Sequence, residues 1–230
     1  MLRTPARLNG TLGRTKFPVE PYLPIVAFAI LFASIGYGWG KFRTRQFQNS
    51  GEARLTRALM SNLSSPDFHL LNHLTLPTAN GTTQIDHVLV SRFGVFVIET
   101  KDYSGWIFAG ASHKKWTQIL YKARFRFQNP LQQNSGHVAT IRELLDFLPA
   151  KDIIPIVVFT GNAQFKTPVP YGVYTLQGFI SYVKDLRDEV MSVNRVQFCV
   201  GRLETTRLAL TRQTDVEHIQ GIRRRHHSND

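Results

Sequence analysis

The sequence predicts an α/β fold in which helices flank a mixed central sheet, preceded by one transmembrane helix. Residues 21–40 contain no charged side chain, which sets an apolar segment apart from the rest of this 230-residue chain. From residue 51 onwards, apolar strand-like runs alternate with helix-like segments. Residues 153–160 form a nearly continuous apolar run, which is typical of a central strand buried on both faces. Together these patterns indicate one layered domain behind one membrane segment.

The chain opens with a polar tail and an apolar span. Residues 1–20 lack a periodic apolar pattern and are expected to form a basic tail. At about 1.5 Å rise per residue, residues 21–40 are long enough to cross the roughly 30 Å hydrocarbon core as one helix. Tyr22, Tyr37 and Trp39 lie near its ends, where aromatic side chains anchor spans at the interface. A cleaved signal peptide is the alternative, but the run is long for one and lacks a good Ala-x-Ala site.

Positive charges flank the span on both sides, with a slight excess after it. The positive-inside rule therefore favours a cytoplasmic C-terminal domain only weakly. The one cysteine, Cys199, cannot form an intrachain disulfide, which is compatible with a reducing compartment. We expect it to be a small apolar strand residue. The predicted location is the inner (plasma) membrane, as a single-pass protein.

The remaining segments follow from periodicity and turn signals. Residues 41–50 are expected to be a polar linker and residues 51–222 one domain, with its core motifs in residues 51–160. Strands are expected, in chain order, at residues 68–76, 83–90, 95–101, 105–109, 115–127 (one or two strands), 153–160 and 173–175. Helices are expected at residues 51–63, 131–147, 177–188 and 207–223, with Pro130 suited to the first turn of the second. Residues 223–230 are expected to form a basic C-terminal tail.

Acidic side chains recur on two adjacent strand-like runs. Side chains at i and i+2 of a strand share a face, so Glu99 and Lys101 project together. Gly94 allows a tight hairpin between the runs, which places Asp86 beside Glu99 on an antiparallel neighbour. Two adjacent carboxylates repel unless a cation lies between them, and oxygen ligands suit Mg²⁺ or Mn²⁺. A lysine beside them can orient a water or offset charge that develops on a phosphate.

At these residues the sequence resembles the nuclease-related domain, a family of the wider restriction-endonuclease-like superfamily with its Asp…(Asp/Glu)-x-Lys signature. The matching segments are residues 51–53, 84–87 and 97–101, Trp116, residues 129–134 and His137. The resemblance spans about residues 50–160. The triad alone recurs by chance, whereas the whole set in this order is specific. The resemblance implies a restriction-endonuclease-like core, nuclease activity and a bacterial source.

The resemblance also implies roles for the charged residues on the two strands. Asp86 and Glu99 are expected to be metal ligands for Mg²⁺ or Mn²⁺. The backbone carbonyl of Thr100 is expected to supply a further oxygen ligand. Lys101 is expected to position the attacking water.

Further site candidates lie on the flanking helices. Glu52, on the first helix, is expected to reach the metal directly or through water. Gln133 is expected to complete the catalytic set, and His137 lies four residues on, hence on the same helical face. His137 is a candidate phosphate contact, or a hydrogen-bonding residue of the helix face. His87 has the strand parity opposite to Asp86 and is expected to point away from the site.

The charge balance indicates the class of partner. Lys and Arg number 28 against 16 acidic residues, a net charge of +12, which suits phosphate backbones or anionic lipid. Basic and aromatic residues interleave before the helix that carries Gln133. The candidate nucleic-acid contacts there are Lys114, Lys115, Lys122, Arg124 and Arg126. The last three share strand parity, which predicts a basic stripe on one face, although a solvated strand edge gives the same pattern.

The favoured prediction is a membrane-anchored, metal-dependent nuclease-like enzyme that hydrolyses phosphodiester bonds, in DNA in preference to RNA. Two alternatives stay open: a membrane-tethered nucleic-acid-binding module with little turnover, and a membrane interaction protein that recognises lipid. The sequence contains no Gly-rich phosphate loop, no Cys-x-x-Cys pair and no internal repeat. Nucleotide hydrolysis by a P-loop and a zinc-finger mode of binding are therefore unsupported.

Overall fold

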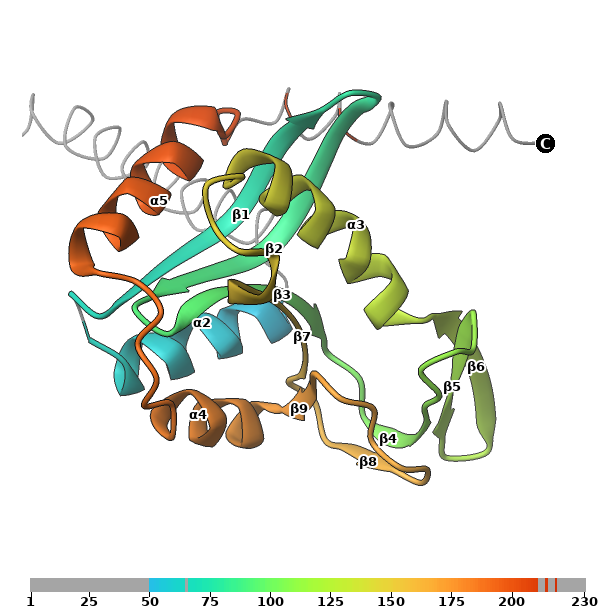
Figure 1. The fold of residues 1–230 in the computed structure, drawn as a ribbon. Helices are drawn as coiled ribbons and strands as arrows, with labels where there is room; N and C mark the ends of the chain where they lie inside the picture. Colours follow the sequence, from blue (N-terminus) through green and yellow to red (C-terminus); the bar gives the residue numbers. More distant parts are fainter. Residues whose placement is uncertain (1–49, 65, 211–213, 215–217, 219–230) are drawn as a thin grey trace, which may run out of the picture. The chain divides into compact units, whose positions relative to one another are not determined.

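The computed structural model describes residues 50–64, 66–210, 214 and 218. In this part of the chain a five-stranded sheet of mixed direction forms the centre (Figure 1). Its strands lie in the order β1 (Phe68–Thr78), β2 (Gly81–Ser91), β3 (Gly94–Lys101), β7 (Ile153–Phe159) and β9 (Val173–Thr175). Neighbours among β1, β2 and β3 are antiparallel, whereas β3, β7 and β9 are parallel. The prediction of a mixed sheet flanked by helices is confirmed.

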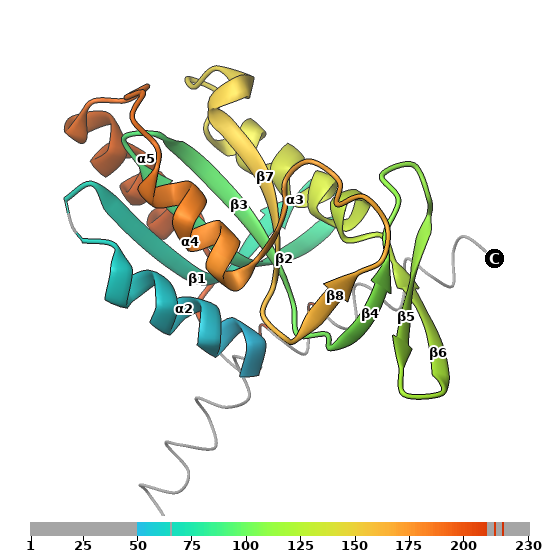
Figure 2. The same ribbon diagram turned by 90° about the horizontal axis from the view of Figure 1, so that it is seen from below.

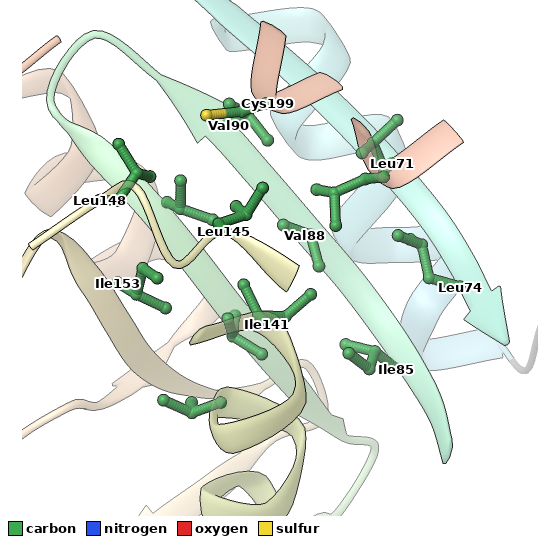
Figure 3. Packing of buried hydrophobic residues seen from close by; sticks show 14 of the residues in the cluster. Leu71, Leu74, Ile85, Val88, Val90, Ile141, Leu145, Leu148, Ile153 and Cys199 are labelled. Atoms are coloured by element: carbon green, nitrogen blue, oxygen red, sulfur yellow. The ribbon is translucent and has the colours of Figure 1, made fainter. Parts of the chain in front are cut away.

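Two helices cover each face of this central sheet (Figure 1). On one face lie α2 (Ser50–Asn62) and α4 (Leu176–Lys184), and on the other lie α3 (Pro130–Leu144) and α5 (Val193–Thr206). A short 3₁₀ turn, η2 (Ala150–Asp152), leads into β7. Close packing between β2, α3 and α5 fills the second face, as Val88, Val90, Ile141 and Cys199 illustrate (Figure 3).

The side chains of β3 alternate between the two faces, as their parity predicts. Val95 and Val97 pack into the core beneath α3 and α5. Phe96 and Ile98 pack into the opposite core, against α2 and α4. Because Glu99 continues the first series, its side chain leaves the sheet on the α3 side.

The hairpin of β1 and β2 is distorted beside Asp86. His73 has a φ of 49°, and the ladder passes from Asn72↔His87 to Leu74↔Ile85 without pairing the residues between them. A left-handed residue in a strand changes which face the following side chains occupy. Consistent with this, Leu71 and Leu74 are three positions apart yet pack into the same core. The distortion frees Asp86 from the backbone pairing on that side.

A second, smaller sheet extends from the ends of β3 and β7 (Figure 2). Its order is β6 (Ala123–Gln128), β5 (Lys115–Leu120), β4 (Gly105–Phe108) and β8 (Ala163–Phe165). Like β3 and β7, the strands β4 and β8 are parallel to each other. Trp116 stacks on Phe159 of the central sheet, with ring centroids 6.3 Å apart, and joins the two sheets through a shared apolar cluster.

A buried asparagine fastens α3 to the central sheet. Asn134 is fully buried, and its Nδ2 donates to the carbonyl oxygens of Val97 on β3, at 2.8 Å, and Ile156 on β7, at 2.9 Å. One side chain therefore ties the helix to two parallel neighbours. This contact sets the register of α3 along the sheet.

The N-terminus of α3 also organises the small sheet. Asn129 caps the helix, because its Oδ1 accepts from the N–H of Leu131 at 2.9 Å, and Pro130 follows at the first helical position. The Nδ2 of Asn129 donates to the carbonyls of Ala111, at 3.0 Å, and His113, at 2.8 Å. The loop before β5 is thus held by the same residue that starts α3.

Most predicted elements are present, with differences at the ends and in the last third. Helices predicted to reach residues 147 and 188 end at Leu144 and Lys184. Neither β8 nor α5 was predicted. The prediction of Cys199 as a strand residue was wrong, because it lies on α5, where burial raises the pKa of its thiol to about 11.

Several predicted segments lie outside the described residues. These are the tail 1–20, the span 21–40, almost all of the linker 41–50 and the tail 223–230. Of the final helix predicted at residues 207–223, residues 207–210 are not helical, whereas 214 and 218 are. Among the described residues, no helix has the length and apolar character needed to cross a membrane.

Replacing Asn134 with alanine should lower the free energy of unfolding by about 2–4 kcal/mol, because two buried carbonyls lose a donor and the side chain leaves a void. For a domain of this size that corresponds to a melting temperature lower by about 5–15 °C. Thermal unfolding followed by circular dichroism measures the change. Gln132→Ala, at an exposed position of the same helix, is the matched control. Equal melting temperatures for the two variants would show that the hydrogen bonds of Asn134 do not stabilise the fold.

Candidate active site

Asp86 lies where the β2–β3 ladder ends and the β1–β2 ladder is interrupted. Pairing between β2 and β3 ends at His87↔Ile98, and the next position would set Asp86 opposite Glu99. Instead the Asp86 carboxylate takes the place of the ladder, because its Oδ2 accepts from the N–H of Thr100 at 2.8 Å. Burial and the neighbouring charge of Glu99 raise the pKa of Asp86 to about 7.

Glu99 is buried and lies beside the Lys101 ammonium group and the His137 imidazole. Its Oε1 lies 2.5 Å from the Nζ of Lys101, and its Oε2 lies 3.5 Å from the Nε2 of His137. Burial alone would raise the pKa of Glu99, but the hydrogen bonding and charge of His137 and Lys101 outweigh it and lower the pKa below its usual value. The two carboxylates of the site therefore differ: Glu99 is held ionised, while Asp86 resists ionisation.

Lys101 is fixed between a strand and a helix. Besides Glu99, its Nζ donates to the Oε1 of Gln133 on α3 at 3.0 Å. The shared strand face of Glu99 and Lys101 that the sequence predicts is thus present. Gln133 joins them because its neighbour Asn134 anchors that turn of α3 to the sheet.

His137 lies one helical turn after Gln133 and faces the same site. Its Nδ1 is 2.9 Å from the Oγ1 of Thr83 on β2, while its Nε2 faces Glu99. The sequence predicted His137 as a phosphate contact or a helix-face residue and did not single out Thr83. A threonine pair three and four residues before Asp86 in the same hairpin was the signal that could have pointed to it.

An open groove of about 450 Å³ runs beside these residues. Its lining is polar and comprises Thr78, Thr82, Thr83, Gln84, Asp86, Gln133, Gly136, His137, Thr140 and His218. Asp86 is the acidic member of this lining. The Oγ1 of Thr82 lies 2.8 Å from the Nδ1 of His218, so these two lining residues contact each other. A phosphate-bearing substrate could enter here past hydroxyl and imidazole groups.

Glu52 occupies a different environment from the other predicted site residues. It lies in the first turn of α2, and its carboxylate pairs with His73, whose Nε2 is 3.1 Å away. Burial, with the nearby charge of Arg207, lowers the pKa of His73 to about 4. The described residues contain no group of three or more His, Cys, Asp and Glu side chains arranged to hold a metal ion. The role of Glu52 as a ligand therefore stays a prediction.

His87 points away from Asp86, as its parity predicts. Its ring lies between Thr56 of α2, 3.1 Å from Nε2, and Thr100 of β3, 3.3 Å from Nδ1. Burial, together with the charge of His73, lowers the pKa of His87 to about 3. It therefore acts as a neutral hydrogen-bonding residue between the helix and the sheet.

The N-terminus of α2 is held at the end of β3 by an acidic residue that the sequence did not single out. Asp102, directly after Lys101, accepts from the Oγ of Ser50 at 2.7 Å and pairs with Arg54. This contact brings the first turn of α2, with Glu52, to the strand end where the site lies.

The donor set of the site fits a hard divalent cation. The Asp86 and Glu99 carboxylates leave adjacent strands at opposing positions, and burial, followed by repulsion from Glu99, raises the pKa of Asp86. A cation between them would offset that repulsion. Carboxylate and carbonyl oxygens, including that of Thr100, are ligands that Mg²⁺ and Mn²⁺ accept.

The predicted basic residues gather at the β5–β6 hairpin, apart from the carboxylate pair. Lys114, Lys115, Arg124 and Arg126 are all exposed. Lys122 is exposed too, but it lies in the turn between the two strands. The predicted strand stripe of three residues was therefore wrong for Lys122 and holds for Arg124 and Arg126.

Comparison with known proteins gives two similarities. Residues 48–160 match the family model of the nuclease-related domain, a segment that contains every predicted site residue. An uncharacterised protein of Bacillus anthracis is 33% identical over 146 residues. That alignment covers 63% of this chain and 66% of the relative, so the chain spans just under two thirds of the relative's length.

Asp86→Asn should stabilise the protein at alkaline pH when no divalent cation is present. The pKa of Asp86 is raised from 3.8 to about 7 in the folded protein, so the folded state binds more protons between these values and loses stability as pH rises. The variant lacks this ionisation, and its amide oxygen can still accept from Thr100.

In EDTA, the melting temperature of Asp86→Asn should exceed that of the wild type at pH 8, and the difference should shrink toward pH 5. Differential scanning calorimetry across this range measures it, with exposed Asp146→Asn as the control. A difference in melting temperature that stays constant with pH would argue against a raised pKa of Asp86.

Proposed function

We propose, from the premise that residues 48–160 form a nuclease-related domain, that this protein is a metal-dependent nuclease that hydrolyses phosphodiester bonds in DNA. The observation that carries the proposal is the position of Lys101. Its Nζ is held by Glu99 and Gln133 beside a second carboxylate, that of Asp86. A structural ion pair would not need a glutamine from a separate helix to orient the lysine.

Asp86 and Glu99 would hold Mg²⁺ or Mn²⁺, with the carbonyl of Thr100 as a further ligand. A bound cation would polarise a phosphate oxygen and lower the pKa of a coordinated water. Lys101 would orient the attacking water and offset negative charge that develops on the phosphate. Gln133 fixes the direction of the lysine, and His137 helps to keep Glu99 ionised.

Membrane attachment through residues 21–40 is the second part of the proposal. The support is the length of the uncharged run, its aromatic ends and the basic residues that follow it. The catalytic domain would lie on the cytoplasmic side of the inner membrane, where nucleic acid and Mg²⁺ are present.

A membrane-tethered nucleic-acid-binding module with little turnover is the second candidate. It is favoured by the exposed basic residues of the β5–β6 hairpin, which lie outside the groove that contains Asp86. In that case Arg124 and Arg126 would matter for binding and Lys101 would not.

Cleavage by the full-length chain should require Mg²⁺ or Mn²⁺ and should fall about 100- to 1,000-fold in Glu99→Gln and in Lys101→Ala. The first substitution removes a charge that would hold the cation, and the second removes the group that offsets developing charge. Gel assays with plasmid, linear and single-stranded DNA and with RNA, at low salt and with an EDTA control, measure it. Lys151→Ala, at an exposed position, is the control for Lys101→Ala. Equal activity in all variants would expose a contaminant, and tight binding without cleavage would favour the binding module.

Divalent cations should also stabilise the protein without substrate. At a concentration about 100 times the dissociation constant, a bound cation adds about 2.7 kcal/mol, or roughly 5–10 °C in melting temperature. The shift should be lost in Glu99→Gln and kept in Glu143→Gln, an exposed control on α3. Thermal melts with Mn²⁺ or EDTA measure it, and equal shifts in both variants would place the cation elsewhere.

A further inference from the structure

The small sheet has one buried and one exposed face. Its buried face carries Ile107, Trp116 and Phe127, which pack in the cluster shared with the central sheet. Strand pairing sets the other series together: Trp106 opposes Ile119, which opposes Arg124, and Phe108 opposes Thr117, which opposes Arg126. With Lys115 at the start of β5, we call these seven residues the outer face.

Two large aromatic side chains are exposed on the outer face. Trp106 is 48% exposed and Phe108 is 36% exposed. They lie two positions apart on β4, so both rings project from one side of the sheet. Lys166, after β8, lies over the Trp106 ring at 4.8 Å, which adds a cation beside the aromatic surface. Adjacent exposed aromatic rings on a small sheet are typical of a binding surface.

The outer face is hollowed at both aromatic residues. A depression of about 580 Å³ is lined by Phe108, Lys115, Arg126 and their neighbours, including Lys114 and His113. A second depression, of about 250 Å³, lies beside Trp106, Ile119 and Tyr121 at the hairpin end. Each exposed ring therefore borders a space that could admit a flat group.

The charge around this face has a single sign. The sequence has no acidic residue between positions 103 and 142, nor between 153 and 184, so β4, β5, β6 and β8 carry none. The basic side chains on and around the face are Lys114, Lys115, Lys122, Arg124, Arg126 and Lys166. Within the described residues, none of the ion pairs involves these six. Their charges are available to an anionic partner.

We propose that the outer face binds single-stranded DNA, with bases stacked on Trp106 and Phe108 and phosphates held by Arg124, Arg126 and Lys115. This rests on the proposed function in that nucleic acid is the substrate. Side chains two apart on a strand are separated by about 6–7 Å, roughly twice the ~3.4 Å repeat of stacked bases in a duplex strand. The spacing suits bases that are unstacked from one another, as on known single-strand platforms. The bases of a duplex are stacked on one another and would not stack on the Trp106 and Phe108 rings.

The location connects this face to the candidate active site. β4 begins at Gly105, four residues after Lys101, and α3 begins two residues after β6 and carries Gln133 in its first turns. DNA held on the outer face would therefore be bound by segments directly joined to Lys101 and Gln133. The nuclease would act on DNA with an unpaired segment, such as a single-stranded tail.

Fluorescence anisotropy of labelled oligo-dT with the full-length chain in EDTA tests the proposal without cleavage. The Trp106→Ala/Phe108→Ala double variant should bind oligo-dT at least about tenfold more weakly than the wild type, because each substitution removes a stacking surface. Its affinity for a blunt duplex should stay within about twofold of that of the wild type. Trp106→Phe should retain affinity, since a phenyl ring can still stack. Phe198→Ala, an exposed aromatic on α5, is the matched control, and circular dichroism melts confirm that each variant is folded.

Different outcomes separate this inference from the proposed function. Unchanged oligo-dT affinity in the double variant, or equal losses for oligo-dT and duplex, overturns the inference, while metal-dependent cleavage of duplex DNA by the wild type leaves the proposed function standing. Tighter binding of oligo-U than of oligo-dT overturns the choice of DNA. If Arg124→Gln/Arg126→Gln affects neither single strand nor duplex, the outer face binds no nucleic acid at all.

Discussion

The amide of Asn134 fixes the arrangement of α3 on which the site depends. By donating to carbonyls of β3 and β7, it fixes the axial position of α3 on the central sheet. In that position Gln133 contacts Lys101, and His137 lies beside Glu99. A buried polar side chain with two satisfied donors holds position more strictly than apolar packing, because sliding the helix would leave buried carbonyls without partners.

The electrostatics of the site follow from which groups share the face beneath α3. Lys101 and His137 lie beside Glu99 and lower its pKa, so its ionised form is stabilised despite burial. Asp86 has a backbone donor and an ionised carboxylate nearby, so its charge is costly. Environments that push the pKa values of two carboxyl groups apart are typical of sites that do chemistry. On the opposite face, burial lowers the pKa of both His87 and His73. His87 forms hydrogen bonds with Thr56 and Thr100, and His73 lies beside Glu52.

Two features of the backbone shape the region around Asp86 and Lys101. The left-handed His73 interrupts pairing beside Asp86 and releases a carboxylate from a strand that is otherwise regular. The parallel pair β3 and β7 then continues into β4 and β8, which begin a new sheet. The first feature lies beside Asp86, which lines the groove. The second places the basic and aromatic surface on segments that follow Lys101 along the chain.

The sequence by itself determined that the sheet is mixed, where its main strands lie along the chain and which residues form the charged cluster. Period-two alternation decides which face a strand residue occupies, so the joint projection of Glu99 and Lys101 and the opposite direction of His87 could be predicted. The resemblance to the nuclease-related domain could also be recognised from the sequence, because its motifs are short and contiguous. Cys199 was misassigned because the helix that carries it shows its apolar side only once its packing partners are known.

The tertiary structure alone decided which distant residues meet. Thr83 reaches His137, Glu52 pairs with His73, and Trp106 joins Arg124 on one face, although no local pattern links the members of any pair. Lys122 belongs to a turn because the hairpin closes there, which strand parity could not foresee. Such contacts depend on strand register and on the height of α3 along the sheet. Both are set by pairing and packing between segments far apart in the chain, and local sequence carries no record of them.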